Sequence, residues 1–261
     1  MLRTRIISAV VGIPILLAVA WAGSYYWMTL ICLLALISLY EILRGAKSAG
    51  IKPLWVIGYL VLCLGLGMPF FSAVTITSVL VSLLLLSLIL MVFLFPRYHI
   101  IDLAVSWFYP AYIGVFMGYA MRLAEVHNHF AIIVFGFILT WASDTGGYFA
   151  GSWWGKHKLA PLLSPKKTWE GFFGGFVLTV IVAIAGSLII PDHALYKFII
   201  LGVAAGLLAP IGDLFASAIK RDMDIKDYGN IIPGHGGILD RFDSFMITVP
   251  LMYFFTLWLG G

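Results

Sequence analysis

Long runs of apolar residues, separated by short polar connections, dominate the chain. A helix needs roughly 20 apolar residues to cross about 30 Å of hydrocarbon. About nine stretches approach or reach that length: residues 5–23, 25–41, 54–68, 72–95, 102–121, 130–149, 171–190, 198–219 and 244–260. Because these runs are continuously apolar rather than alternating, they predict an all-α polytopic integral membrane protein and not a β-barrel.

The composition supports residence in a membrane. Hydrophobic residues make up 62% of the 261 positions, whereas an ordinary soluble domain has about 45–50%. Charged residues make up only 11%, less than half of the usual ~25%. These values exclude intrinsic disorder, and the presence of only two cysteines excludes a disulfide-rich secreted scaffold. With no internal repeat and no linker, residues 1–261 are expected to form a single integral membrane domain.

The positions of Lys and Arg test the order of the spans, because these residues concentrate on the cytoplasmic side. With the N-terminus placed in the cytoplasm, only Arg122 and Lys197 of the 16 Lys and Arg fall outside. A missed or invented helix would reverse the sidedness of everything after it. We therefore predict a cytoplasmic N-terminus and an outside C-terminus. An alternative interprets residues 1–23 as a signal peptide, which leaves the sidedness of the later loops unchanged.

Two polar islands interrupt the apolar pattern, and both lie on the predicted cytoplasmic side. The first runs from Ser143 to Gly171, and the second runs from Asp213 to Ser244. A charged loop of a membrane protein is usually only solvated, so a functional site needs further evidence.

The carboxylate of Asp213 is the first such evidence, because it lies about two turns inside an apolar stretch. An unpaired charge there costs at least about 2.5–3.5 kcal/mol on insertion scales, so such groups usually pair or line a polar cavity. Ser217, Lys220 and Asp224 follow Asp213 at the spacing of one helix face. The alternative is an internal salt bridge between Asp213 and a lysine, without any chemistry.

The run from Pro233 to Asp243 combines glycines with acidic residues. Its glycines free the backbone for a close approach to a ligand, and Asp240 and Asp243 share one face of the predicted ninth helix. Together with Asp213, these carboxylates would supply the hard oxygen ligands that suit Mg²⁺ beside a nucleotide. Helix N-capping by Asp240 and dipole compensation by Asp243 are alternatives that need no metal.

A basic patch accompanies these acids in the first island, formed by Lys156, His157, Lys158, Lys166 and Lys167. Mixed acidic and basic groups suit a metal together with phosphates. The alternative is a polybasic segment that lies on anionic lipid head groups, and an anionic lipid substrate would satisfy both interpretations.

The second island resembles a known signature. Ser217-Ala218-Ile219-Lys220-Arg221, then Lys226-Asp227-Tyr228-Gly229, and then Ile232 through Asp243 are similar to the motif of the phosphatidate cytidylyltransferases, the CDP-diacylglycerol synthases. Ser143-Asp144-Thr145-Gly146 and the run from Ser164 through Gly171 in the first island also resemble that family. The resemblance implies transfer of CMP from CTP to phosphatidic acid, giving CDP-diacylglycerol and pyrophosphate, at the cytoplasmic face of a bacterial inner membrane.

The resemblance also implies the site. It implies dependence on Mg²⁺, allows a second, monovalent cation such as K⁺, and points to a homodimer without a nucleic-acid partner. The first half of the chain then supplies mainly scaffold and dimer helices, and residues 130–261 carry the site. The predicted metal ligands are Asp144, Asp213, Asp240 and Asp243. The predicted catalytic residues are Asp213, Lys220, Lys226, Asp227, Asp240 and Arg241. The predicted substrate-binding residues are Ser164, Lys166, Lys167, Thr168, Glu170, Ser217, Arg221, His235, Gly236 and Gly237.

Two other functions compete with this one. An ion-coupled transporter would bind a cation at Asp213, but it predicts polar residues at similar depth in several helices, and the outer half of this chain has few. A different CTP-using lipid enzyme, such as a polyisoprenol kinase, would transfer phosphate to an alcohol.

Overall fold

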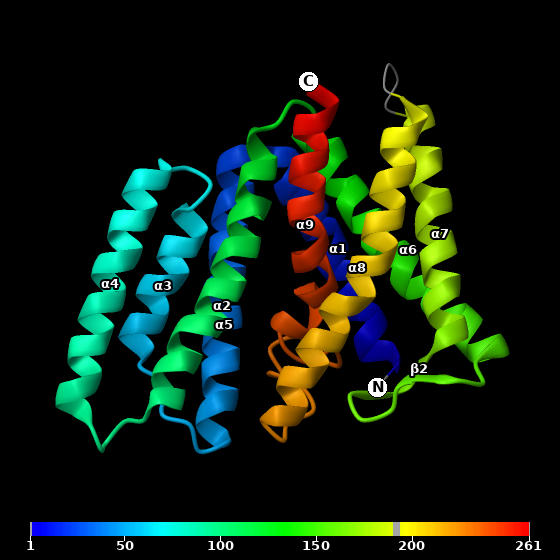
Figure 1. The fold of residues 1–261 in the computed structure, drawn as a ribbon. Helices are drawn as coiled ribbons and strands as arrows, with labels where there is room; N and C mark the ends of the chain where they lie inside the picture. The colour runs from blue at the N-terminus through cyan, green and yellow to red at the C-terminus, as the bar shows by residue number, and fades with distance from the viewer. Residues whose placement is uncertain (1, 190–193, 261) are drawn as a thin grey trace. The chain divides into compact units, whose positions relative to one another are not determined.

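The computed structural model describes residues 2–189 and 194–260, and it is 80% helical. The described residues form nine α-helices (Figure 1). They are α1 (Leu2–Ala22), α2 (Ser24–Ser48), α3 (Trp55–Gly67), α4 (Ala73–Leu94), α5 (Ile100–Arg122), α6 (His129–Trp154), α7 (Trp169–Ile189), α8 (Leu195–Asp222) and α9 (Leu239–Gly260). Most ends of these helices lie within three residues of the predicted apolar stretches, but α2 ends at Ser48 instead of residue 41, α6 ends at Trp154 instead of residue 149, and α9 begins at Leu239 instead of residue 244. A short 3₁₀ helix, η1 (Leu123–Glu125), follows α5.

Seven of the described helices are long and apolar enough to cross a membrane, namely α2 and α4 to α9. The apolar part of α1, Ile6–Ala22, and the whole of α3 are shorter. The prediction of a helical polytopic membrane protein is therefore confirmed. The count of nine spans and the sidedness of the two termini stay predictions.

The chain packs as two compact units. The first unit comprises Met1–Glu125 and Asp222–Arg241, and the second comprises Val126–Arg221 and Phe242–Gly261. Helices α1 to α5 and the connection between α8 and α9 thus belong to the first unit. Helices α6, α7 and nearly all of α8 belong to the second, as does α9 from Phe242 onwards. The second polar island is consequently divided between the two units.

Glycines and buried polar groups hold the first unit together. Helices α3 and α5 approach so closely that a Cβ on Gly65 would lie 2.7 Å from the carbonyl carbon of Gly114. The indole N–H of Trp27 on α2 donates to the carbonyl of Ala120 on α5 at 2.7 Å. Membrane helices often pack through small residues in this way, because lipid supplies little hydrophobic drive for association.

Glycines also line the helix contacts of the second unit. A Cβ on Gly175 of α7 would lie 2.5 Å from the carbonyl oxygen of Ser143 on α6. On α8, a Cβ on Gly202 would lie 2.7 Å from the Cβ of Ala183 on α7, and one on Gly206 would meet Phe176. These small residues therefore serve helix packing within this unit.

A short β-hairpin in the second unit departs from the predicted all-helical pattern. Strands β1 (Lys158–Ala160) and β2 (Ser164–Thr168) pair antiparallel, with Lys158 opposite Thr168 and Ala160 opposite Ser164. The strands are short and largely polar, so they lack the alternation that predicts a strand from sequence.

One residue of the predicted face on α8 lies elsewhere. The helix ends at Asp222, and Asp224 takes a left-handed conformation with φ of 54°. The prediction that Asp224 continues the face of Asp213, Ser217 and Lys220 is therefore wrong. A left-handed residue breaks the helical repeat, so spacing measured across it no longer defines a face.

Candidate functional site

The polar end of the second unit gathers residues from both islands. The hairpin connects the end of α6 to the start of α7 (Figure 1). The guanidinium Nε of Arg221, near the end of α8, donates to the carbonyl of Leu163 in the hairpin turn at 3.3 Å. Within this unit, segments that are 58 residues apart in sequence therefore contact each other.

An ion pair joins the hairpin to α8. Lys167 Nζ lies 2.6 Å from Asp213 Oδ2, and the two side chains are 25% and 34% exposed. The hydroxyl of Ser217, one turn later, donates to Asp213 Oδ1 over a longer distance of 3.4 Å. Asp213 is thus paired, as its depth in an apolar stretch predicts, and its partner comes from the other island.

Asp243 is a neighbour of both Asp213 and Asp144. Gly212 lets α8 approach α9, because a Cβ there would lie 2.8 Å from the carbonyl oxygen of Asp243. Asp243 is buried, and its side chain is close enough to Asp213, Asp144 and Lys220 for their charges to interact. The carboxylate of Asp243 also accepts the N–H of Ser244 at 2.7 Å. Three of the four predicted metal ligands therefore lie in one region of the second unit.

The chemistry of these groups fits a divalent cation. Carboxylate oxygens are hard ligands of the kind that Mg²⁺ prefers, and a cation would relieve the repulsion of Asp243 by Asp213 and by Asp144. Among the described residues, no three His, Cys, Asp or Glu side chains are close enough to hold an ion as they stand. Asp213 is engaged with Lys167, so a cation would compete with an ammonium group for this carboxylate.

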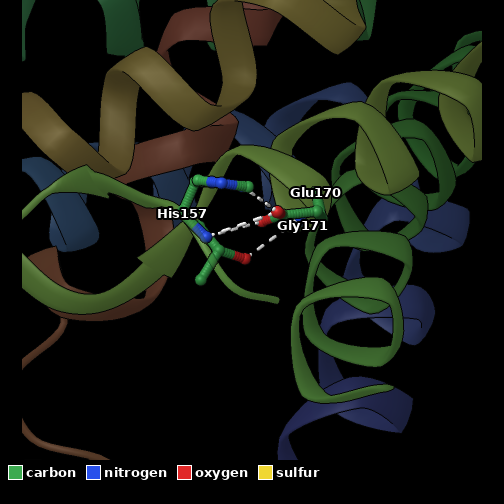
Figure 2. A network of polar contacts seen from close by, with 4 residues as sticks. His157, Glu170 and Gly171 are labelled. Carbon is green, nitrogen blue, oxygen red and sulfur yellow. Dashed lines mark hydrogen bonds and ion pairs between the residues drawn. The ribbon is translucent and has the colours of Figure 1, made fainter. Parts of the chain in front are cut away.

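Glu170 closes the base of the hairpin. Figure 2 shows the backbone and imidazole of His157 facing the Glu170 carboxylate, with Nδ1 2.6 Å from Oε1. The N–H of His157 donates to both carboxylate oxygens at 3.3 and 3.2 Å, and the N–H of Trp169 donates back to the His157 carbonyl at 2.9 Å. The hydroxyl of Thr168 accepts the N–H of Gly171 at 3.1 Å. Glu170 and Thr168 therefore hold the strand that carries Lys166 and Lys167.

The connection between α8 and α9 forms a second polar cluster, in the first unit. Asp240, the second residue of α9, is only 6% exposed, and its Oδ2 accepts the N–H of Tyr228 at 2.8 Å and that of Gly237 at 3.0 Å. Gly234 and Gly236 have φ values of 76° and 90°, which only glycine adopts readily. The Asp240 carboxylate therefore ties the two arms of this loop together.

The predicted site residues fall into these two clusters. The second unit contains Asp144, Ser164, Lys166, Lys167, Thr168, Glu170, Asp213, Ser217, Lys220, Arg221 and Asp243. The first unit contains Lys226, Asp227, His235, Gly236, Gly237, Asp240 and Arg241. Lys166, Lys226, Asp227 and Arg241 are exposed, whereas Gly237, Asp240 and Asp243 are buried.

Sequence reasoning missed one carboxylate that contacts the loop of the first unit. Glu41 lies in α2 and is 2% exposed, and its carboxylate accepts the N–H groups of Ile238 and Leu239. An acidic residue near the end of an apolar span is the signal that would have identified it, because such residues are rare and usually have a partner.

Known proteins resemble this chain along nearly its whole length. Residues 3–259 match the cytidylyltransferase family. A protein of Staphylococcus saprophyticus named phosphatidate cytidylyltransferase is 34% identical over 256 residues, covering 96% of this chain and 97% of its own length. Proteins of the same name from Bacillus subtilis and Staphylococcus aureus are also 34% identical, over 267 and 257 residues, covering 97% and 96% of this chain and 97% of each relative.

Proposed function

The chain belongs to the cytidylyltransferase family, and on this premise we propose that it transfers CMP from CTP to phosphatidic acid, giving CDP-diacylglycerol and pyrophosphate. The names of its relatives support this pair of substrates. One structural observation carries the proposal furthest. The ion pair between Lys167 and Asp213 joins one residue from each polar island in a cluster of mixed charge, which suits phosphate groups and a cation together.

The reaction makes modest demands on acid–base chemistry. An oxygen of the phosphatidic acid phosphate attacks the α-phosphorus of CTP, a new P–O–P linkage forms, and the bond to the β-phosphate breaks to release pyrophosphate. The lipid phosphate is already anionic near neutral pH, so no strong general base is needed. The protein must instead bring two polyanions together and hold them in line.

Basic side chains would bring the two polyanionic substrates together. We assign Lys220, Arg221, Lys226 and Arg241 to the phosphates of CTP, where they stabilise the charge of the departing pyrophosphate. Lys166 and Lys167 would bind CTP or the lipid phosphate. The polar groups that remain, including Ser164, Thr168, Glu170, Ser217, Asp227 and the turn His235-Gly236-Gly237, would shape the substrate site or hold its segments in place.

The carboxylates would hold the cation that such a reaction requires. Asp213 and Asp240 are assigned to Mg²⁺, with Asp144 and Asp243 as further ligands, and a second, monovalent cation such as K⁺ belongs to the same proposal. When bound, Mg²⁺ neutralises phosphate charge and orients the triphosphate. Without a bound cation, the negative charge of these acids would repel CTP. With a cation bound, the acids would position the substrates through it.

The cellular setting belongs to the proposal as well. We place the chain as a single integral membrane domain in a bacterial inner membrane, with residues 130–261 carrying the site at the cytoplasmic face and the first half serving mainly as scaffold. The active form is proposed to be a homodimer. This setting lets CTP arrive from the cytosol and the lipid arrive from the leaflet.

An assay of the purified full-length protein tests the proposal. The protein is incubated with CTP, Mg²⁺ and vesicles that contain phosphatidic acid, and both pyrophosphate and the lipid product are measured. Equal amounts of pyrophosphate and CDP-diacylglycerol support the proposed reaction. Transfer of phosphate to a polyisoprenol with release of CDP would identify a lipid kinase instead, and the absence of both reactions with folded protein would refute the proposal.

A further inference from the structure

A buried carboxylate far away in sequence holds the first residues of α9. The two oxygens of Glu41 on α2 accept the backbone N–H groups of Ile238 and Leu239, each at 3.0 Å. Helix α9 begins at Leu239, and the first N–H groups of a helix have no partner within the helix. Burying a carboxylate is costly unless hydrogen bonds compensate for the lost water. The carboxylate of Glu41 therefore supplies acceptors for the N–H groups at the start of α9, and these N–H groups supply the hydrogen bonds that the buried carboxylate needs.

The loop before α9 is shaped around the same carboxylate. A Cβ on Gly237 would lie 2.5 Å from Glu41 Oε2, and one on Gly229 would clash with Glu41 Oε1. The loop thus passes this side chain twice, each time at a glycine. The glycines at both positions therefore make room for the carboxylate of Glu41.

The contacts of Glu41 continue directly into those of Asp240. Asp240 follows Leu239 in the chain, and its own Oδ2 accepts the N–H of Gly237. The short segment from Gly237 to Asp240 is therefore held on one side by Glu41 and on the other by Asp240. A displacement of the Glu41 carboxylate would move the amides of this segment, and Asp240 would move with them.

From this geometry we infer that Glu41 is a positioning residue for the proposed cytidylyl transfer, acting through the start of α9 on Asp240 and the Gly236-Gly237 turn. The inference rests on the proposed function. It gives part of the N-terminal half, which the sequence identifies mainly as scaffold, a role in ordering the site. The proposed role of Glu41 is exerted through its hydrogen bonds to Ile238 and Leu239 and not by contact with a reacting atom.

The substitution Glu41→Gln tests the inference in full-length protein reconstituted in phosphatidic acid vesicles. Glutamine has nearly the same shape, but its NH₂ group cannot accept a hydrogen bond, so one of the two amides loses its partner. A misplacement of about 1 Å in a site can cost about 100-fold in rate, and we expect kcat to fall by about this factor. The fall in kcat should exceed the change in the KM of either substrate, and hydrogen exchange of residues 227–241 should accelerate.

Asp102→Asn is the matched control. Asp102 is 3% exposed and also accepts two backbone N–H groups, from Lys52 at 2.7 Å and from His99 at 2.8 Å, at the start of α5. The chemical change is the same, so a comparable loss of thermal stability is expected. Because Asp102 does not hold the loop before α9, kcat should change by less than about threefold. Equal losses of kcat in the two variants would reduce Glu41 to a general stabilising residue and overturn the inference.

The variant Gly229→Ala provides a second test of the inference if the Glu41→Gln variant does not fold. The added methyl group would press on the Glu41 carboxylate while leaving its charge in place. The same loss of kcat and faster exchange in residues 227–241 are expected, whereas wild-type kcat in this variant would contradict the inference. A folded wild-type protein that makes no CDP-diacylglycerol would instead refute the proposed function, and the exchange data would still report whether Glu41 anchors the loop.

Discussion

The two polar clusters use carboxylates in opposite ways. In the second unit, Asp213 is 34% exposed at its side chain and pairs with another side chain, the ammonium of Lys167. In the first unit, Asp240 is buried and binds backbone N–H groups from two positions of one loop. One cluster is built from charges that face each other, and the other is built from carboxylates that fix the backbone.

This difference suggests that the cluster of the second unit serves substrate recognition, whereas the carboxylates of the first unit hold the loop in place. The ion pair of Lys167 and Asp213 is only partly buried, so exchange of its partners for a phosphate or a cation should cost less than displacement of a fully buried carboxylate. A buried carboxylate that accepts two N–H groups is much harder to displace, because leaving buried donors unsatisfied costs about 1–3 kcal/mol each. We therefore expect substitutions in the second unit to affect activity more than stability, and substitutions in the loop of the first unit to affect both.

The largest effect is expected from Asp213→Asn. Loss of this charge should lower kcat by about 1000-fold, at the upper end of the effect of removing one electrostatic group from a preorganised site. The melting temperature should hardly change, because the lost ion pair is partly exposed. Turnover and thermal unfolding of the detergent-purified protein measure both quantities. Asp222→Asn, an exposed carboxylate at the end of the same helix, is the control, and equal turnover in the two variants would exclude Asp213 from the site.

A pair of substitutions at Asp240 distinguishes its proposed role in the reaction from its role in holding the loop before α9. Asp240→Asn keeps an oxygen that can accept the N–H groups of Tyr228 and Gly237, whereas Asp240→Ala removes it. Both should lower turnover by at least about 100-fold, but the alanine variant should lose about 1–3 kcal/mol more stability. Activity assays and denaturation curves distinguish the two. Near-normal turnover of Asp240→Asn would leave Asp240 with a role in the loop alone.

A smaller effect is expected from Lys167→Gln, with Lys166→Gln as its neighbour on the same strand. Lys167 forms an ion pair with Asp213. Loss of one charge-assisted hydrogen bond should lower kcat/KM for CTP by about tenfold for Lys167. The exposed Lys166 should lose less than about threefold, because exposed charges contribute little. Steady-state kinetics with varied CTP provide the measurement, and a larger loss at Lys166 would reverse the assignment.

The smallest effect is expected at the base of the hairpin. Glu170→Gln and His157→Gln each weaken the contact shown in Figure 2, so tryptic cleavage at Lys158 and Lys166 should accelerate in both variants. Because the His157 side chain is 78% exposed, kcat/KM should fall by no more than about threefold. If Glu170→Gln raises the KM for CTP strongly while His157→Gln does not, Glu170 binds substrate directly, as the sequence alone predicted.

The local pattern of apolar and polar residues predicted the helices well but did not predict the hairpin. The nine apolar stretches correspond to the nine helices of the described residues, because the preference of an apolar side chain for lipid is independent of its neighbours. The strands at Lys158–Ala160 and Ser164–Thr168 pair with each other, and the contact between His157 and Glu170 lies at the base of this hairpin. The predicted face on α8 failed at Asp224, where the chain leaves the helix.

The sequence by itself determined the all-α membrane class, the approximate positions of the helices, and the acidic and basic residues of the two islands. Only the tertiary structure decided which side chains meet: Lys167 with Asp213 in the second unit, and Glu41 with the start of α9 in the first. The physical reason is that helix formation and membrane insertion depend on residues close in sequence. Partner choice depends on where glycines such as Gly212 and Gly237 let separate segments approach each other.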